Sequence, residues 1–116
     1  MHEPKTLWRI ARRRASVSFT PWTSASRDAP EYIVQFDEWL ASLPLPEESF
    51  CYFISGPHDA IEMSWAEAIV RLRSTFPTSG EVFVLGEDLR TLVTLSSVGV
   101  ARFTPAYDAD ASHEVA

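Results

Sequence analysis

Two short runs, residues 50–54 and 82–85, are apolar on both alternating faces. This pattern is typical of strands in the interior of a sheet. A turn sequence follows the second run, and two further segments, 89–96 and 100–104, flank Gly99, which permits a tight reversal. The last three strands are therefore predicted to form an antiparallel meander.

Two other segments have the spacing of amphipathic helices. Asp28 is a suitable N-cap and Pro30 suits a first turn, which predicts a helix over residues 29–43. The predicted buried stripe of this helix is Tyr32, Ile33, Phe36, Leu40 and Leu43. Ser64 and Glu67 form a capping box at the start of the second helix. Its predicted buried side chains are Trp65, Ile69, Leu72 and Phe76.

The N-terminal segment is ambiguous. Residues 7–19 begin with helix formers and end with β-branched and aromatic residues. We favour an edge strand, because neither alternating face is cleanly apolar and charged side chains protect a sheet edge. The alternative is a helix over residues 6–14 followed by a strand over 15–20. Residues 20–30 and 57–63 carry turn and polar residues and are expected to be loops.

These elements predict a single α+β domain over residues 1–106. Its central sheet of about five strands is antiparallel or mixed, and two helices pack on it. The chain of 116 residues is long enough to bury a core without disulfides or metals. Residues 107–116 are expected to be a flexible C-terminal tail. The strand order and the oligomeric state are left open.

The charges are divided unevenly along the chain. The whole sequence has ten Lys and Arg against sixteen Asp and Glu, whereas the first fourteen residues hold five bases and one acid. An acidic body attracts basic partners and speeds their encounter. We therefore expect a basic protein partner and no direct binding of nucleic acid, whose phosphates the body would repel. The N-terminal arginines are expected to pair with Glu31, Asp37 or Glu38 inside the fold.

The remaining sequence features exclude several classes of protein. The single cysteine, Cys51, cannot form an internal disulfide, so a reducing, cytoplasmic compartment is expected. Cys51 itself is expected to be a small buried side chain. No apolar run approaches the roughly 18 residues that span a bilayer, so no membrane partner is expected. No glycine-rich phosphate loop, calcium loop or closed zinc-ligand set occurs, so no cofactor and no metal are expected.

Three acidic clusters are the candidate partner-binding residues. They are Glu31, Asp37 and Glu38; Glu47 and Glu48 with Asp59 and Glu62; and Glu87 with Asp88. Two clusters that converge in space would form a negative surface for a basic partner. No catalytic residue is assigned, but one alternative is a small enzyme that uses His58 with Asp59 or Glu62 as acid and base. Another is a regulatory or structural subunit that docks through the region of Trp8 and Trp22.

The C-terminal half combines a capped helix start with a strand, a turn and an alternating strand through Thr94. The segments are Ser64-Trp65-Ala66-Glu67, Glu81-Val82-Phe83-Val84-Leu85 and Gly86-Glu87-Asp88. This arrangement, together with the acidity, resembles small bacterial immunity proteins, the inhibitors encoded beside contact-dependent and other polymorphic toxins. The resemblance implies a cytosolic domain that binds and blocks a cognate toxin domain, often a cationic nuclease. It assigns no functional positions, because no family motif is matched residue by residue.

Overall fold

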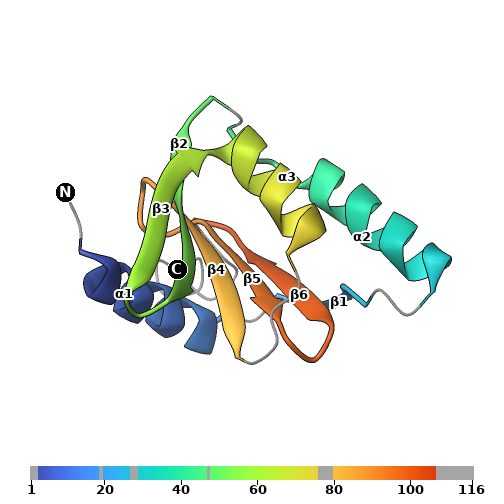
Figure 1. The fold of residues 1–116 in the computed structure, drawn as a ribbon, viewed down its shortest axis with the longest axis horizontal. Coiled ribbons are helices and arrows are strands. Elements are labelled where there is room, and N and C mark those ends of the chain that lie inside the picture. The colour runs from blue at the N-terminus through green and yellow to red at the C-terminus, as the bar shows by residue number, and fades with distance from the viewer. Residues whose placement is uncertain (1–2, 19, 27–28, 47, 76–79, 107–116) are drawn as a thin grey trace, which may run out of the picture.

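The computed structural model describes residues 3–18, 20–26, 29–46, 48–75 and 80–106. Within them the chain forms helices and one sheet, which confirms the predicted α+β class (Figure 1). In chain order the elements are α1 (Pro4–Ser16), β1 (Thr23–Ser24), α2 (Pro30–Ser42), β2 (Phe50–Gly56), β3 (Asp59–Ser64), α3 (Trp65–Ser74), β4 (Glu81–Gly86), β5 (Leu92–Ser96) and β6 (Val100–Thr104).

The sheet has the strand order β1-β6-β5-β4-β2-β3, and every neighbouring pair is antiparallel. The predicted meander is confirmed as β4, β5 and β6. Strand β2 lies between β4 and β3, so Phe53 pairs with Val84 on one side and Ile61 on the other. The two doubly apolar runs are therefore interior strands, as their pattern predicted.

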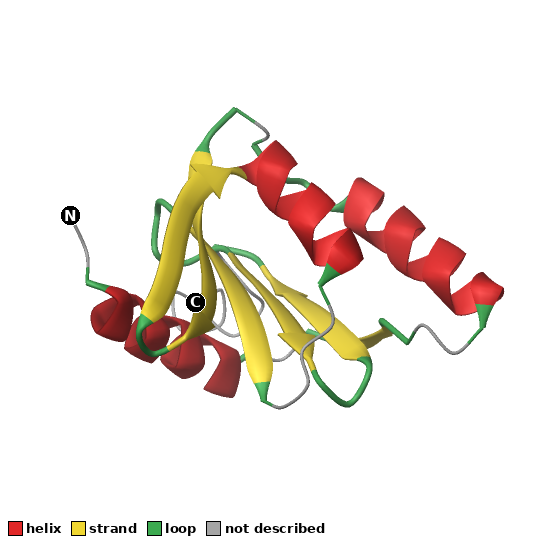
Figure 2. Cartoon of the chain, in the orientation of Figure 1, coloured by secondary structure: helices red, strands yellow, loops and turns green. Residues whose placement is uncertain are grey.

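Helices cover both faces of the sheet, with α1 on one face and α2 and α3 on the other (Figure 2). Successive side chains of a strand point to opposite faces, so each apolar strand supplies both cores. On β2, Ile54 packs with Leu7 of α1, whereas Phe53 packs with Leu72 of α3. This two-sided burial explains why neither β2 nor β4 has a polar face.

Both predicted helices form. The hydroxyl of Ser64 accepts a hydrogen bond from the backbone N–H of Glu67 at 3.2 Å, so the N-cap of α3 is confirmed. Trp65 and Leu72 are buried, while Phe76 lies outside the described residues. On α2, Phe36 and Leu40 are buried as predicted, but two other members of the stripe, Tyr32 and Ile33, are each 41% exposed. The N-terminal half of α2 projects past the sheet (Figure 1).

The favoured edge strand at residues 7–19 is wrong, because residues 7–16 belong to α1. Leu7 and Ala11 are one helical turn apart, and both are buried against the sheet. Helix α1 lies against β2, β4 and β5, and the small side chain of Ala11 is fully buried. The helical part of our alternative is thus correct, but its strand over 15–20 is not, since α1 continues to Ser16.

Two expected loops also contain strands. Residues 57–63 were expected to be a loop, but residues 59–64 form β3, the edge strand beside β2. Its alternation is weak because Ile61 is 44% exposed, so Met63 is the one buried residue of this strand. The expected loop at 20–30 contains β1, which pairs with β6.

The predicted tail, residues 107–116, lies outside the described residues. None of the helices described is long and apolar enough to cross a membrane.

Candidate functional site

An aromatic pair on β2 is the centre of the candidate site. The rings of Phe50 and Tyr52 meet edge to face, with 5.5 Å between their centroids. Both side chains lie on the sheet face that carries α1, because they alternate with the oppositely directed Cys51. Phe50 is 36% exposed, so part of this pair is open to a partner.

Two acidic side chains flank this pair. Glu62 of β3 is directly opposite Tyr52 in the ladder, and opposite residues share a sheet face. Glu87 follows Gly86, which pairs with Cys51 at the start of β2. We call Phe50, Tyr52, Glu62 and Glu87 the acidic surface.

Both glutamates act on the ionisation of Tyr52. Burial raises the pKa of Tyr52, and the negative charges of Glu62 and Glu87 raise the pKa further. The two glutamates come from different predicted clusters, 25 positions apart in the chain. The structure therefore brings members of the second and third clusters together.

Other members of these clusters make local contacts. Asp59 accepts a hydrogen bond from the hydroxyl of Ser55 at 2.6 Å. The carboxylate of Asp88 accepts hydrogen bonds from the backbone N–H groups of Arg90 and Thr91 and from the Thr91 hydroxyl. Burial alone would raise the pKa of Asp88, but these hydrogen bonds outweigh it and lower the pKa. Asp88 thus stabilises the turn that follows Glu87.

The acidic clusters do not all share one side. Glu31, Asp37 and Glu38 lie on α2, which covers the opposite face of the sheet from the acidic surface. Asp37 forms an exposed ion pair with Arg73 of α3, at 3.7 Å between its Oδ1 and the arginine Nε. Glu48 is exposed in the connection before β2, and Glu47 lies outside the described residues.

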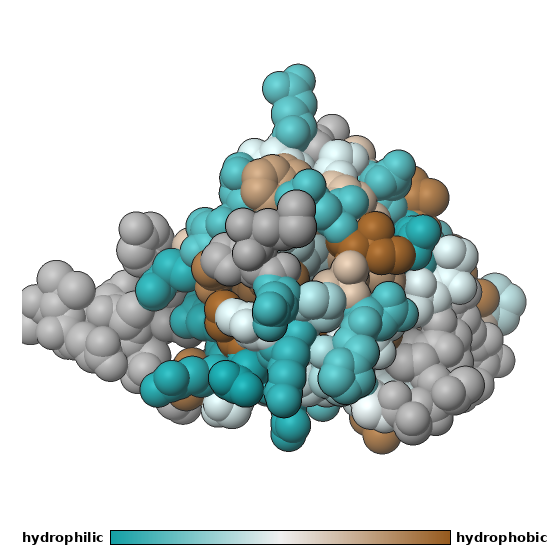
Figure 3. Space-filling view, turned by 60° about the vertical axis from the view of Figure 1, so that its left-hand side comes forward, coloured by the Kyte–Doolittle hydropathy of each residue, from teal (hydrophilic) through white to brown (hydrophobic). Residues whose placement is uncertain are grey.

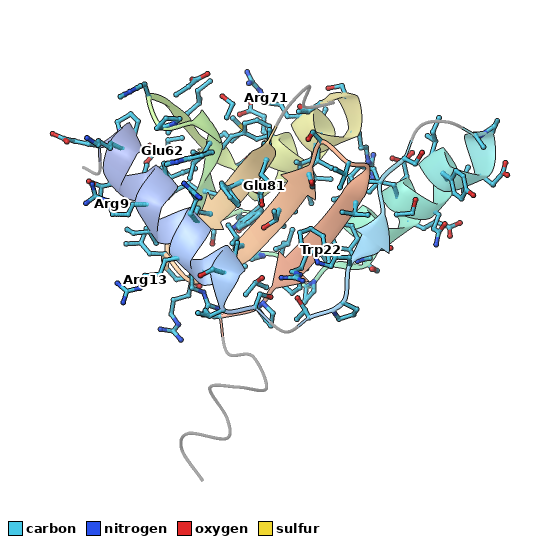
Figure 4. All side chains as sticks on the ribbon, turned by 90° about the horizontal axis from the view of Figure 1, so that it is seen from below. Arg9, Arg13, Trp22, Glu62, Arg71 and Glu81 are labelled. Atoms are coloured by element: carbon cyan, nitrogen blue, oxygen red, sulfur yellow. The ribbon has the colours of Figure 1, made fainter. Side chains whose placement is uncertain are left out.

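The basic N-terminal segment forms a cationic ridge, which we define as Lys5, Arg9, Arg12 and Arg13 on the exposed side of α1. Figure 4 shows Arg9 and Arg13 pointing outward from the helix. The expected pairing of these arginines with Glu31, Asp37 or Glu38 does not form, because α1 and α2 cover opposite faces of the sheet.

Arg14 differs from the ridge because it is fixed against the body. Its guanidinium donates hydrogen bonds to the carbonyl oxygens of Arg90, at 3.0 Å, and Pro105, at 2.8 Å.

Figure 3 views the side of the molecule where α1 and β3 lie, and hydrophilic side chains dominate it with smaller hydrophobic areas between them. The acidic surface and the cationic ridge belong to the same face of the sheet, because Tyr52 packs in the cluster that contains Leu7 and Ala11 of α1.

His58 and Asp59, the alternative acid–base pair, lie at the turn between β2 and β3. His58 is exposed in the β2–β3 turn, and the carboxylate of its neighbour Asp59 bonds Ser55. Cys51 is buried as expected, and burial together with the charge of Glu67 raises its pKa to about 12, so the thiol stays protonated at neutral pH. The described part of the chain contains no group of three or more His, Cys, Asp or Glu side chains that could bind a metal ion.

No family model matches this chain, and neither does any curated protein or solved structure. Sequence reasoning missed Phe50 and Tyr52 as surface residues, because an interior strand was expected to bury both of its faces. The available signal was their position at the start of the strand, where covering elements end.

Proposed function

We propose that this protein binds a basic protein partner through the acidic surface and performs no catalysis itself. The carrying observation is the convergence of Glu62 and Glu87 on the Phe50–Tyr52 pair. Protein interfaces combine an aromatic centre with a polar rim, and aromatic residues supply much of their binding energy. The two carboxylates would steer a cationic partner toward that centre.

The class of partner that best fits this chemistry is a cationic enzyme domain, such as a nuclease toxin. Its active site is built to hold phosphates, and a pair of fixed carboxylates beside an aromatic ring can occupy such a site. The protein would then act as a bacterial immunity protein in the cytoplasm. The free, buried Cys51 is compatible with that reducing compartment.

The test is calorimetric titration of the purified protein with the product of the neighbouring gene, which the proposal expects to be a cationic domain. The variant E62Q/E87Q removes both carboxylates and should weaken binding about tenfold or more, since each close charge pair contributes at least about 1 kcal/mol. The matched control E31Q/E38Q removes two charges from α2 and should change affinity less than about threefold. Equal losses in both variants, or no binding at low salt, would refute the proposal.

A further inference from the structure

The cationic ridge lies on a chain whose formal charge is −6. Within the described residues, none of its four side chains forms an ion pair or a hydrogen bond. Side chains three or four residues apart lie on one helix face, so Lys5, Arg9, Arg12 and Arg13 present a single positive stripe. Carboxylates outnumber bases in this protein, so a stripe left without carboxylate partners is available to bind an external anion.

The ridge also borders a groove. This groove has a volume of about 450 Å³, and Trp8, Ser16 and Pro57 line it together with the ridge. A second hollow of about 190 Å³ shares Arg12 and Ser16 with it and continues toward Glu81. The lining therefore combines positive charge with apolar surface from Trp8 and Pro57.

The dimensions of the ridge suit a short ligand. Lys5 and Arg13 are eight residues apart on α1, which corresponds to about 12 Å along the helix axis. About four residues of extended peptide span that length. Successive ridge positions one helical turn apart are separated by about 6 Å, close to the roughly 7 Å between alternate side chains of an extended chain.

The aromatic residues argue against single-stranded nucleic acid as the ligand, because bases need free ring faces on which to stack. The guanidinium of Arg102 covers the Trp22 ring at 4.1 Å from its centroid. Trp8 is half-buried and meets Phe83 edge to face at 5.2 Å. The carboxylate of Glu81 in the adjoining hollow can accept a hydrogen bond from a peptide N–H, a donor that a phosphate backbone lacks.

We propose that the cationic ridge and its groove bind a short, extended acidic segment of a protein partner. Carboxylates of the segment pair with the ridge, where arginine can bind a carboxylate through two parallel hydrogen bonds. An apolar side chain of the segment packs on Trp8 and Pro57. This surface is separate from the acidic surface and takes a ligand of opposite charge.

The test uses fluorescence anisotropy with a labelled oligo-glutamate peptide of about ten residues that carries one central leucine. In the full-length protein, R9A/R13A should weaken binding about tenfold or more. R71A/R73A is the matched control, because it removes two positive charges from α3 on the opposite face. It should change affinity less than about threefold, and circular dichroism should show both variants folded.

Three results would overturn the proposal. Equal losses in the two variants would show that net charge alone attracts the peptide. Tighter binding of inorganic polyphosphate than of the peptide, lost in R9A/R13A, would assign the ridge to a phosphate ligand. Dimers in light scattering that disappear in R9A/R13A would show that the ridge binds a second copy of this chain. These outcomes do not depend on the result for E62Q/E87Q. The proposal for the cationic ridge and the proposal for the acidic surface can therefore be refuted separately.

Discussion

The acidic surface and the cationic ridge lie on the same side of the sheet but are built in different ways. The ridge is local, since its four side chains fall within nine consecutive residues of one helix. The acidic surface needs three strands in one register, because Glu62 reaches Tyr52 through the β2–β3 ladder and Glu87 through the β2–β4 ladder. The ridge therefore depends on one helix remaining docked, and the acidic surface depends on the whole sheet.

This difference also separates what holds each surface in place. Two buried residues of α1, Leu7 and Ala11, seat the ridge on the sheet. The acidic surface is held by backbone pairing and by the turn that Asp88 stabilises. Substitutions in these supports should affect the two surfaces differently.

The largest expected effect comes from undocking the ridge. Leu7 is 2% exposed, so Leu7→Ala should lower the free energy of unfolding by about 2–4 kcal/mol through lost burial and the cavity it leaves. Urea denaturation measures this loss. The neighbouring exposed residue provides the control, and Lys5→Ala should stay within about 0.5 kcal/mol. A similar stability for both variants would contradict the docking of α1 on the sheet.

A smaller effect is expected at the turn behind the acidic surface. Asp88→Ala removes the acceptor of three hydrogen bonds and should cost about 1–2 kcal/mol at pH 7. The adjacent Glu87→Ala, which leaves those bonds intact, should change stability by less than about 0.5 kcal/mol.

The same residue should give a defined pH dependence. The pKa of Asp88 is lowered in the folded state, so its contribution is complete above the unfolded pKa of about 4 and is lost as pH falls through the lowered value. The stability difference between the wild type and Asp88→Ala should therefore shrink below about pH 4. A difference that stays constant across this range, measured by urea denaturation, would contradict the role of the carboxylate.

Local patterns predicted most of the fold. The two-sided apolar runs of β2 and β4, the N-cap at Ser64 and the meander all depend on neighbouring residues, and they formed as expected. Segment α1 was misassigned because Arg9 and Arg13 on its exposed face resemble the protective charges of an edge strand. The helix formers at its start and the helical spacing of Leu7 and Ala11 carried the correct signal.

The candidate site was less predictable, because it depends on register. The sequence identified Glu62 and Glu87 as candidates, but only the pairing of Tyr52 with Glu62 and of Cys51 with Gly86 places them around one ring. Residues 57–63 were expected to be a loop, so β3, the strand that carries Glu62, was not predicted. For the cationic ridge, the sequence showed the charged residues, but the helix that aligns them was the less favoured alternative.

The most direct test of the account is the ionisation of Tyr52. With ring-labelled tyrosine, the Tyr52 pKa can be followed by NMR in the wild type and in Glu62→Gln and Glu87→Gln. We expect each substitution to lower this pKa, because each removes a negative charge that opposes the phenolate, and we expect Glu31→Gln to leave it unchanged. An unchanged pKa in either variant would show that the two clusters do not converge, which would contradict the acidic surface itself.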